Sequence, residues 1–370
     1  MDALLNRRQL LGASAAALLS GRAFAEAARA QGPILVGAEQ GLVQRTGAKT
    51  FALRALAEDG RLSARIELPF HMHGFAGHPL ERRYAAVFEK KGPGAAIVDL
   101  ERSQVVQPLA PAKGRQFYGH GAYSPDGALL FGTETVPEAK SGVIAVRDVR
   151  AGYREIAHFA SHGSAPHDCH LVDDGKVMVI AHGGSAAEEK NQDPPSVTWV
   201  DVKTEKLLDK LYIPAPHLNA GHLAIGKNGD VAVVSAPRKG RAALDNGGIT
   251  LRPHGERAKT LSAPEQVVRQ LVGEVLSVAL HEGTRTIAAT NPDGNLLTFW
   301  HVPQGLLRRS VTLEKPRGVV VTPDQRWFAV THGDAIPRVS FFSTAELAVR
   351  DRPDIQDAKL TGSHIYNWAW

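Results

Sequence analysis

The chain has 370 residues, is 43% hydrophobic and carries a formal net charge of +5. This charge is too small to indicate nucleic-acid binding, and no basic run is interleaved with aromatic residues. The single cysteine, Cys169, excludes an intramolecular disulfide, so the packing of the fold must supply its stability.

Residues 1–25 have the features of an export signal. Arg7 and Arg8 precede a modest apolar run, and Ala23-Phe24-Ala25 offers a small-x-small cleavage site, with a second site after Ala30. This pattern predicts a twin-arginine signal; the alternative is an ordinary secretory signal with two adjacent basic residues. The apolar run is too short to span a bilayer. We therefore expect a mature protein that does not span the membrane and is located in the periplasm.

Similar hairpin sequences recur along the rest of the chain. One of them contains Ser124-Pro125-Asp126-Gly127, in which Pro has the φ of a type I turn and Gly accepts a positive φ. The repeats are separated by roughly 40–55 residues, the period of four-stranded propeller blades. They start near His73, His120, His170, His222, Leu276, Gly318 and His364.

The repeats predict an all-β fold, a seven-bladed β-propeller of the WD40/YVTN-like kind over residues 34–370, after a short linker at 26–33. Six or eight blades are the alternatives. Ser363–Trp370 begins like an inner strand but has no chain left to complete a blade, so we expect Ile34–Gln40, Thr50–Ala57 and Leu62–Leu68 to supply the other three strands. This pairing would close the ring and remove exposed sheet edges. We also expect a fourth strand of the sixth blade near Leu360 and a short helix within 264–273.

Histidines recur where the predicted inner strands begin. In a propeller these positions surround the central channel, and neutral imidazole is a common ligand for Fe, Cu and Zn. Neighbouring imidazoles lower one another's pKa, which keeps their nitrogens free for a metal ion. The structural alternative is that the channel only needs polar side chains. The predicted metal site, a channel ring, consists of His73, His120, His167, His170, His222 and His364.

Other polar residues give weaker signals. His71, His73 and His78 form a local group that could also hold a metal, and Cys169 adds a thiol to the third repeat. His182 and His332 are expected to cap blade edges. Glu134 and Glu39 either join a site or pair with Arg115 or Arg317, and we favour pairing.

Several segments together resemble the DUF1513 family of periplasmic propellers. These are the twin-arginine leader and the HGFAGHP, GHGAYSPDG, LLFGTE and SAPHDCHL sequences. The resemblance covers essentially the whole mature chain. It implies a role linked to iron uptake, with imelysin-like proteins and di-haem oxidoreductases as partners, and it supplies no catalytic residues.

Two functions from different classes are consistent with the sequence. The first is a non-enzymatic binding or scaffold protein for iron or another transition metal. The second is a lactonase- or quinoprotein-like enzyme acting on a small molecule at the channel mouth, which rests on analogy of fold. The chain contains no G-x-S-x-G, H-E-x-x-H or P-loop motif.

Overall fold

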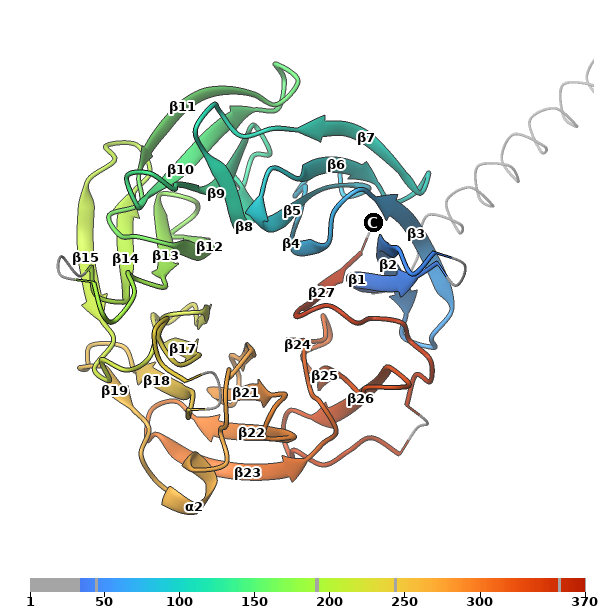
Figure 1. Cartoon of the computed structure of the whole chain (residues 1–370). Helices are drawn as coiled ribbons and strands as arrows, with labels where there is room; N and C mark the ends of the chain where they lie inside the picture. Colours follow the sequence, from blue (N-terminus) through green and yellow to red (C-terminus); the bar gives the residue numbers. More distant parts are fainter. Residues whose placement is uncertain (1–33, 44–45, 190–192, 243–244, 352–353, 370) are drawn as a thin grey trace, which may run out of the picture.

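The computed structural model describes residues 34–43, 46–189, 193–242, 245–351 and 354–369. The predicted signal and linker, residues 1–33, therefore lie outside the described residues. The fold is all-β: small antiparallel sheets follow one another around a common centre, an arrangement consistent with a β-propeller (Figure 1). No helix in these ranges is long and apolar enough to cross a membrane.

The sheets share one plan, in which the chain moves from a central strand outward by hairpins. The central strands are β4 (Met72–Gly77), β8 (Gln116–Tyr123), β12 (Pro166–Val172), β16 (His222–Ile225), β20 (Ser277–His281), β24 (Val319–Val321) and β27 (Ile365–Trp368). The second strands are β5 (Tyr84–Gly92), β9 (Leu129–Val136), β13 (Val177–His182), β17 (Val231–Ser235), β21 (Thr286–Asn291), β25 (Trp327–His332) and β1 (Ile34–Leu42).

The outer half of each sheet continues this order. The third strands are β6 (Ala95–Asp99), β10 (Ser141–Asp148), β14 (Ser196–Asp201), β18 (Gly248–Arg252), β22 (Leu296–His301), β26 (Arg338–Ser343) and β2 (Lys49–Ala57). The fourth strands are β7 (Gln104–Leu109), β11 (Arg154–Ala160), β15 (Leu207–Tyr212), β19 (Lys259–Thr260), β23 (Leu306–Thr312) and β3 (Leu62–Leu68). The expected helix is the single short turn α2 (Glu265–Val268).

Two sheets depart from the simple plan. The sheets that contain β5 and β8 join into one eight-stranded sheet, because Lys90 pairs with Tyr118 and Gly92 with Phe117. The sheet of β24, β25 and β26 has three strands. The fourth strand expected near Leu360 is wrong: two isolated bridges, Val339 to Ile355 and Phe342 to Val349, stand in its place.

The C-terminal strand pairs with the N-terminal strands. Strand β27 lies antiparallel to β1, with Ile34 opposite Trp368 and Gly37 opposite Ile365, in the sheet order β27-β1-β2-β3. The three N-terminal strands begin and end within two residues of the expected positions. Segments from the two ends of the described chain therefore form one sheet (Figure 1).

The core lies between neighbouring sheets. Val234 and Ile249, from β17 and β18, belong to the same buried cluster as Ile287 and Trp300, from β21 and β22. Because both faces of the middle strands are covered in this way, β17 is buried at every residue instead of alternating. The fourth strands face solvent, as the mostly exposed β23 illustrates.

The predicted turn geometry is present at the 124–127 hairpin. The N–H of Gly127 donates to the carbonyl of Ser124 at 2.8 Å, and Gly127 has a φ of +69°. The Asp126 carboxylate accepts from the Ser124 hydroxyl at 2.6 Å and from the N–H of Ala128 at 3.0 Å. These bonds fix the hairpin that carries His120 into the centre of the molecule.

Candidate metal centre

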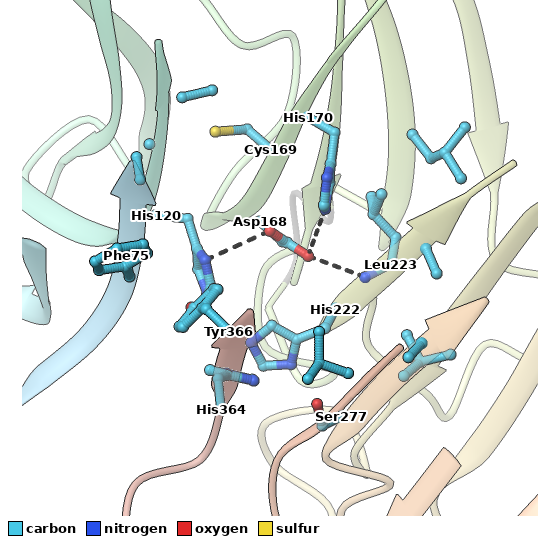
Figure 2. Close-up of a pocket in the computed structure, with 18 of the residues that line it drawn as sticks. Phe75, His120, Asp168, Cys169, His170, His222, Leu223, Ser277, His364 and Tyr366 are labelled. Atoms are coloured by element: carbon cyan, nitrogen blue, oxygen red, sulfur yellow. Dashed lines mark hydrogen bonds and ion pairs between the residues drawn. The ribbon is translucent and has the colours of Figure 1, made fainter. Parts of the chain in front are cut away.

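One cavity of about 730 Å³ lies where the central strands of the sheets meet, and each of these strands contributes to its wall (Figure 2). His120, Asp168, His222 and His364 line it together with mostly apolar side chains. The cavity therefore joins the predicted ring positions to a space large enough for a small molecule.

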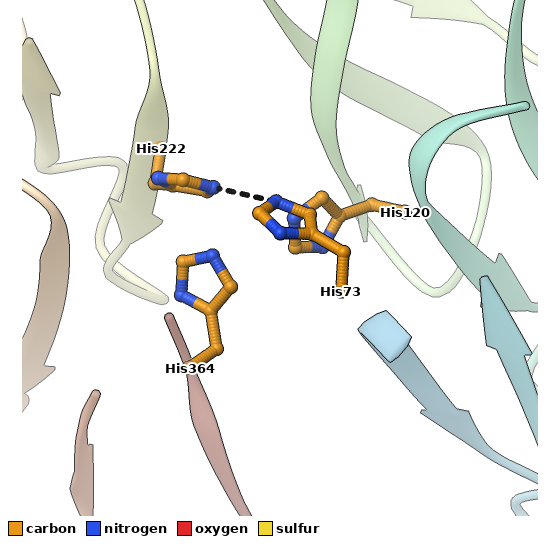
Figure 3. A group of neighbouring side chains, drawn as sticks. All are labelled: His73, His120, His222 and His364. Atoms are coloured by element: carbon orange, nitrogen blue, oxygen red, sulfur yellow. Dashed lines mark hydrogen bonds between the residues drawn. The ribbon is translucent and has the colours of Figure 1, made fainter. Parts of the chain in front are cut away.

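Four of the predicted histidines converge beside this cavity. His73, His120, His222 and His364 are buried, and one ring nitrogen of each lies within 4.8 Å of those of the other three (Figure 3). They come from β4, β8, β16 and the residue preceding β27, so segments far apart in the sequence meet here. A set of four imidazole nitrogens at this spacing could hold one metal ion.

His167 is packed against the same group. Its Nε2 lies 2.9 Å from Nε2 of His73, and the two rings are stacked with centroids 5.1 Å apart. Nε2 of His222 lies 3.4 Å from the same His73 nitrogen. An imidazole nitrogen carries either one proton or one lone pair, so His73 Nε2 cannot make a good hydrogen bond to both neighbours.

Asp168 connects the group to its surroundings. One carboxylate oxygen lies 3.5 Å from Nδ1 of His120, and the other accepts from Nε2 of His170 at 3.3 Å and from the N–H of Leu223 at 3.0 Å (Figure 2). A carboxylate on one ring nitrogen orients a histidine and makes the opposite nitrogen a better ligand. This leaves Nε2 of His120 as the nitrogen available to ligate a metal ion.

The unpartnered nitrogens fit a cation. Among the described residues, Nε2 of His120, Nδ1 of His222 and Nε2 of His364 are buried and have no hydrogen-bond partner in the protein. Leaving a buried polar atom unpaired is costly, and buried polar groups are normally satisfied. A metal ion bound by the lone pairs of His120 and His364 would satisfy these two atoms, whereas His222 approaches His73 through its other nitrogen, Nε2.

The histidines of the group are neutral at physiological pH. Burial lowers the pKa of His120 from 6.5 to about 4, although the Asp168 carboxylate acts in the opposite direction. Burial, with repulsion from neighbouring imidazoles and Lys90, holds the pKa values of His73, His222 and His364 well below 6.5. The neutral ring is the form that ligates metal ions.

A repeated pair of hydrogen bonds between a backbone group and a threonine hydroxyl, here called the threonine bracket, marks equivalent positions on the central strands. The N–H of His120 donates to the hydroxyl of Thr133 at 3.2 Å, and this hydroxyl donates to the His120 carbonyl. The same pair of bonds joins Gly318 to Thr331. The N–H of Ser277 likewise donates to the Thr290 hydroxyl at 3.1 Å, but this hydroxyl donates at 2.5 Å to the carbonyl of Arg317. His120, Ser277 and Gly318 are therefore equivalent positions, and β20 and β24 supply no imidazole there.

The structure brings together most, but not all, of the predicted ring. His73, His120, His222 and His364 form the four-nitrogen group, and His167 contacts it through His73. His170 lies on the other side of Asp168, with 44% of its side chain exposed. Burial disfavours its charged form, but the Asp168 carboxylate outweighs this and raises the pKa of His170 above 6.5.

The sequence analysis gave Asp168 no role and regarded the neighbouring Cys169 as a possible thiol ligand. Cys169 packs in a hydrophobic cluster with Phe131 and Met178, and burial raises the pKa of its thiol, so it is no thiolate ligand. The alternation of a β-strand could have identified Asp168, because it places Asp168 and His170 on the face opposite Cys169.

The acidic residues pair with arginines, as expected. Glu134 binds Nε of Arg115 at 3.1 Å and also Nη2 of Arg147 at 2.6 Å. Glu39 binds Arg54 at 2.8 Å and Arg65 at 3.1 Å instead of Arg115 or Arg317. Both carboxylates are therefore structural.

The remaining histidines do not join the group. His71 packs its ring against Phe51 with centroids 5.5 Å apart, and Nδ1 of His78 accepts the N–H of Glu81 at 2.9 Å. His332 bonds Ser340 at 2.7 Å at the end of β25, and His182 is buried at the end of β13. Within the described residues, no metal-binding group other than the four histidines is present.

Comparisons with known proteins found solved structures with a similar fold and a matching family. A chain of Kuenenia stuttgartiensis hydrazine synthase has a TM-score of 0.61 at 12% identity, over 80% of this chain and 92% of that one. A chain of the mitotic checkpoint complex has a TM-score of 0.55 at 15% identity, over 77% of each chain. At these identities the likeness concerns the fold alone.

Curated protein sequences give no significant match. The model of a family described as "Protein of unknown function (DUF1513)" matches residues 66–359. This range includes most of the described sheets and all of the metal-site histidines except His364. The chain belongs to the DUF1513 family.

Proposed function

We propose that this protein binds one transition-metal ion in its central channel through His73, His120, His222 and His364. The observation that carries the proposal is the meeting of four buried imidazole nitrogens, from four separate strands, within 4.8 Å of one another. The carboxylate behind His120 and the unpartnered nitrogens support it.

The donor set narrows the choice of ion. The group contains imidazoles only, which suit Cu, Zn and Fe. By the usual order of divalent affinities, Cu²⁺ should bind most tightly in a purified sample, and availability would select the ion in the cell. Iron is the ion that the family resemblance implies, and we keep it as the proposed physiological cargo.

We also propose the architecture and location in which this site works. Counting the eight-stranded sheet as two, the sheets make seven blades, and the pairing of β27 with β1 closes the ring. The leader would deliver the protein to the periplasm, where it would work beside imelysin-like and di-haem partners in metal uptake. Changing Arg7 and Arg8 to Lys should leave the precursor in the cytoplasm; normal periplasmic accumulation would contradict the twin-arginine route.

The decisive measurement is metal binding by protein purified without a histidine tag. Calorimetry with Cu²⁺, Zn²⁺ and Fe²⁺ should show one tight site per chain, lost when His120 and His222 are both changed to Ala. A matched control changes the exposed His158 and His217 to Ala and should retain the site. If the buried double variant does not fold, His364→Gln provides the comparison. Equal binding by all variants would make the four histidines architecture.

A second candidate function draws on one observation. His170 and Asp168 lie together on the cavity wall, where an enzyme acting on a small molecule, such as a lactonase, would place an acid and a base. If this candidate is correct, His170→Gln should abolish turnover of a lactone panel without changing the metal content. Lack of turnover by the wild-type, metal-loaded protein would exclude it for those substrates.

A further inference from the structure

We infer that the central cavity holds a second ligand: a neutral, mainly apolar small organic molecule with one nitrogen or oxygen donor atom directed at the metal ion. This inference rests on the proposed metal site and adds the chemical class of what the ion meets there. It is carried by the shape, lining and charge of the cavity.

The metal site opens toward the cavity on one side. His120, His222 and His364 line the cavity, whereas His73 and His167 do not. An ion held by the four-nitrogen group would therefore face the cavity between three of its ligands. Copper and iron accept more than four ligands, so a donor atom entering from the cavity can complete the coordination.

The wall of the cavity is apolar. Phe75, Tyr366 and Trp368 form an aromatic corner, in which the Phe75 ring centroid lies 5.5 Å from that of Tyr366 and 5.9 Å from that of Trp368. The remainder of the wall is largely aliphatic, with Leu171, Leu223, Ile225, Val278, Ala279, Val319, Val320 and Ile365. A volume of about 730 Å³ is within the usual range for sites that bind small organic molecules.

The cavity offers no free charge to a polar ligand. No Lys, Arg or Glu is among the described residues that line it. Of its ionisable side chains, Asp168 and His170 are bonded to each other, and Asp168 also accepts the N–H of Leu223. Apart from the ion itself, the wall offers no cationic partner to a polycarboxylate chelator, so each carboxylate that does not ligate the ion would lose its hydration without compensation. The body of the ligand must therefore be neutral.

Strands β20 and β24, which have no histidine at the position equivalent to His120, provide space beside the proposed ion. Ser277 occupies the position equivalent to His120 on β20, and Gly318, followed by Val319, occupies it on β24. Small and aliphatic side chains thus replace two imidazoles on adjacent strands. This sector is where the body of a ligand can lie while its donor atom reaches the ion.

The test uses three probes with one donor group and different bodies. Imidazole, 4-phenylimidazole and imidazole-4-acetate are titrated into the full-length protein loaded with Cu²⁺ or Co²⁺, and the ligand-field absorption band reports coordination. We expect 4-phenylimidazole to bind on the order of tenfold or more tightly than imidazole, because its phenyl ring is buried against the wall. The anionic imidazole-4-acetate should bind more weakly than 4-phenylimidazole.

A substitution that fills the cavity tests where the body of the ligand lies. Val320 is half-buried and lines the cavity, so Val320→Trp should remove the advantage of 4-phenylimidazole while imidazole still binds. Val106→Trp, on the exposed strand β7, should preserve the advantage. If Val320→Trp does not fold, Val278→Trp replaces it.

The outcomes separate this inference from the proposed function. A chain that binds metal but shows equal affinity for the three probes, or prefers the anionic one, overturns the apolar-ligand inference alone. An advantage that survives the cavity-filling variant also overturns it. A chain that binds no metal overturns both proposals.

Discussion

Nδ1 of His120 lies 3.5 Å from Oδ1 of Asp168, and the other carboxylate oxygen is bonded to the backbone of Leu223 on the next sheet. The carboxylate thus joins three central strands, β8, β12 and β16, at the level of the histidine group. Its negative charge stabilises the His120 ring in the orientation that directs Nε2 away from Asp168. The first prediction tests this positioning role.

Asp168→Asn should lower metal affinity by about 10- to 100-fold, the usual effect of losing a carboxylate behind a histidine ligand. The amide keeps the size of the side chain but lacks the negative charge. Competition titration against a chelator of known affinity provides the measurement. Asp230→Asn is the control, because Asp230 is a buried carboxylate that pairs with Arg285 away from the cavity. Identical affinities for the two variants would remove Asp168 from the site.

The second prediction concerns the buried ion cluster on β9 and β10. Glu134 is fully buried and neutralises Arg115 and Arg147, with only Glu155 as a further acidic partner. Glu134→Gln should lower the free energy of unfolding by about 3–5 kcal/mol, since it leaves buried guanidinium charge uncompensated. Urea unfolding measures this change.

A surface carboxylate gives the comparison for that measurement. Glu101 pairs with Arg83 and has 48% of its side chain exposed, so Glu101→Gln should cost less than about 1 kcal/mol. Similar losses for the two variants would show that the Glu134 cluster contributes no more than a surface pair.

The third prediction is a pH effect at His182. Burial, followed by the nearby Lys210, lowers the pKa of His182 from 6.5 to about 3, and Asp193 acts weakly in the opposite direction. Between these two values the unfolded chain binds a proton that the folded chain does not. The stability contributed by the neutral ring is complete above pH 6.5 and decreases as the pH falls toward about 3.

His182→Gln removes this proton linkage. As the pH falls below 6.5, the unfolding free energy of the wild type should decrease relative to that of the variant by about 1.4 kcal/mol per pH unit. Urea unfolding at pH 7, 6 and 5 measures it, with the pH 7 difference as the internal reference. A difference that does not change with pH would mean that the folded protein accepts the proton on His182.

The fourth prediction tests ring closure. Removing residues 363–370 deletes β27, exposes the edge of β1 and uncovers Phe75, against which Trp368 packs. We expect a sharply lower melting temperature and increased self-association, because unpaired strand edges promote aggregation. His364→Gln in the full-length chain separates loss of the strand from loss of the ligand. An unchanged melting curve for the truncated chain would contradict closure.

The strands could be predicted from the sequence because their signals are local. The turn at Ser124–Gly127 and the spacing of the hairpins fix where strands start, and the incomplete segment at Ser363 predicts its pairing with β1. The expected strand near Leu360 failed because the outer edge of β26 makes only isolated bridges among the described residues, from Val339 to Ile355 and from Phe342 to Val349. Isolated bridges leave little pattern in the sequence.

The site could be predicted only in part. Equivalent positions in a repeat converge on the axis, so His73, His120, His222 and His364 could be grouped from their spacing. The role of Asp168 could not, because it depends on the backbone of Leu223 in the next sheet and on which nitrogen of His120 faces it. Contacts between sheets depend on how neighbouring strands tilt, and the sequence of one repeat does not encode that tilt.

The threonine bracket at His120 in β8, Ser277 in β20 and Gly318 before β24 has an evolutionary consequence. Its bonds involve only the backbone of His120, Ser277 and Gly318, and the hydroxyls of Thr133, Thr290 and Thr331. The side chain at the bracketed position takes no part in these bonds, so it can change without breaking them. Point mutations at these positions can therefore add or remove a donor atom at the central cavity while the bonds of the bracket remain.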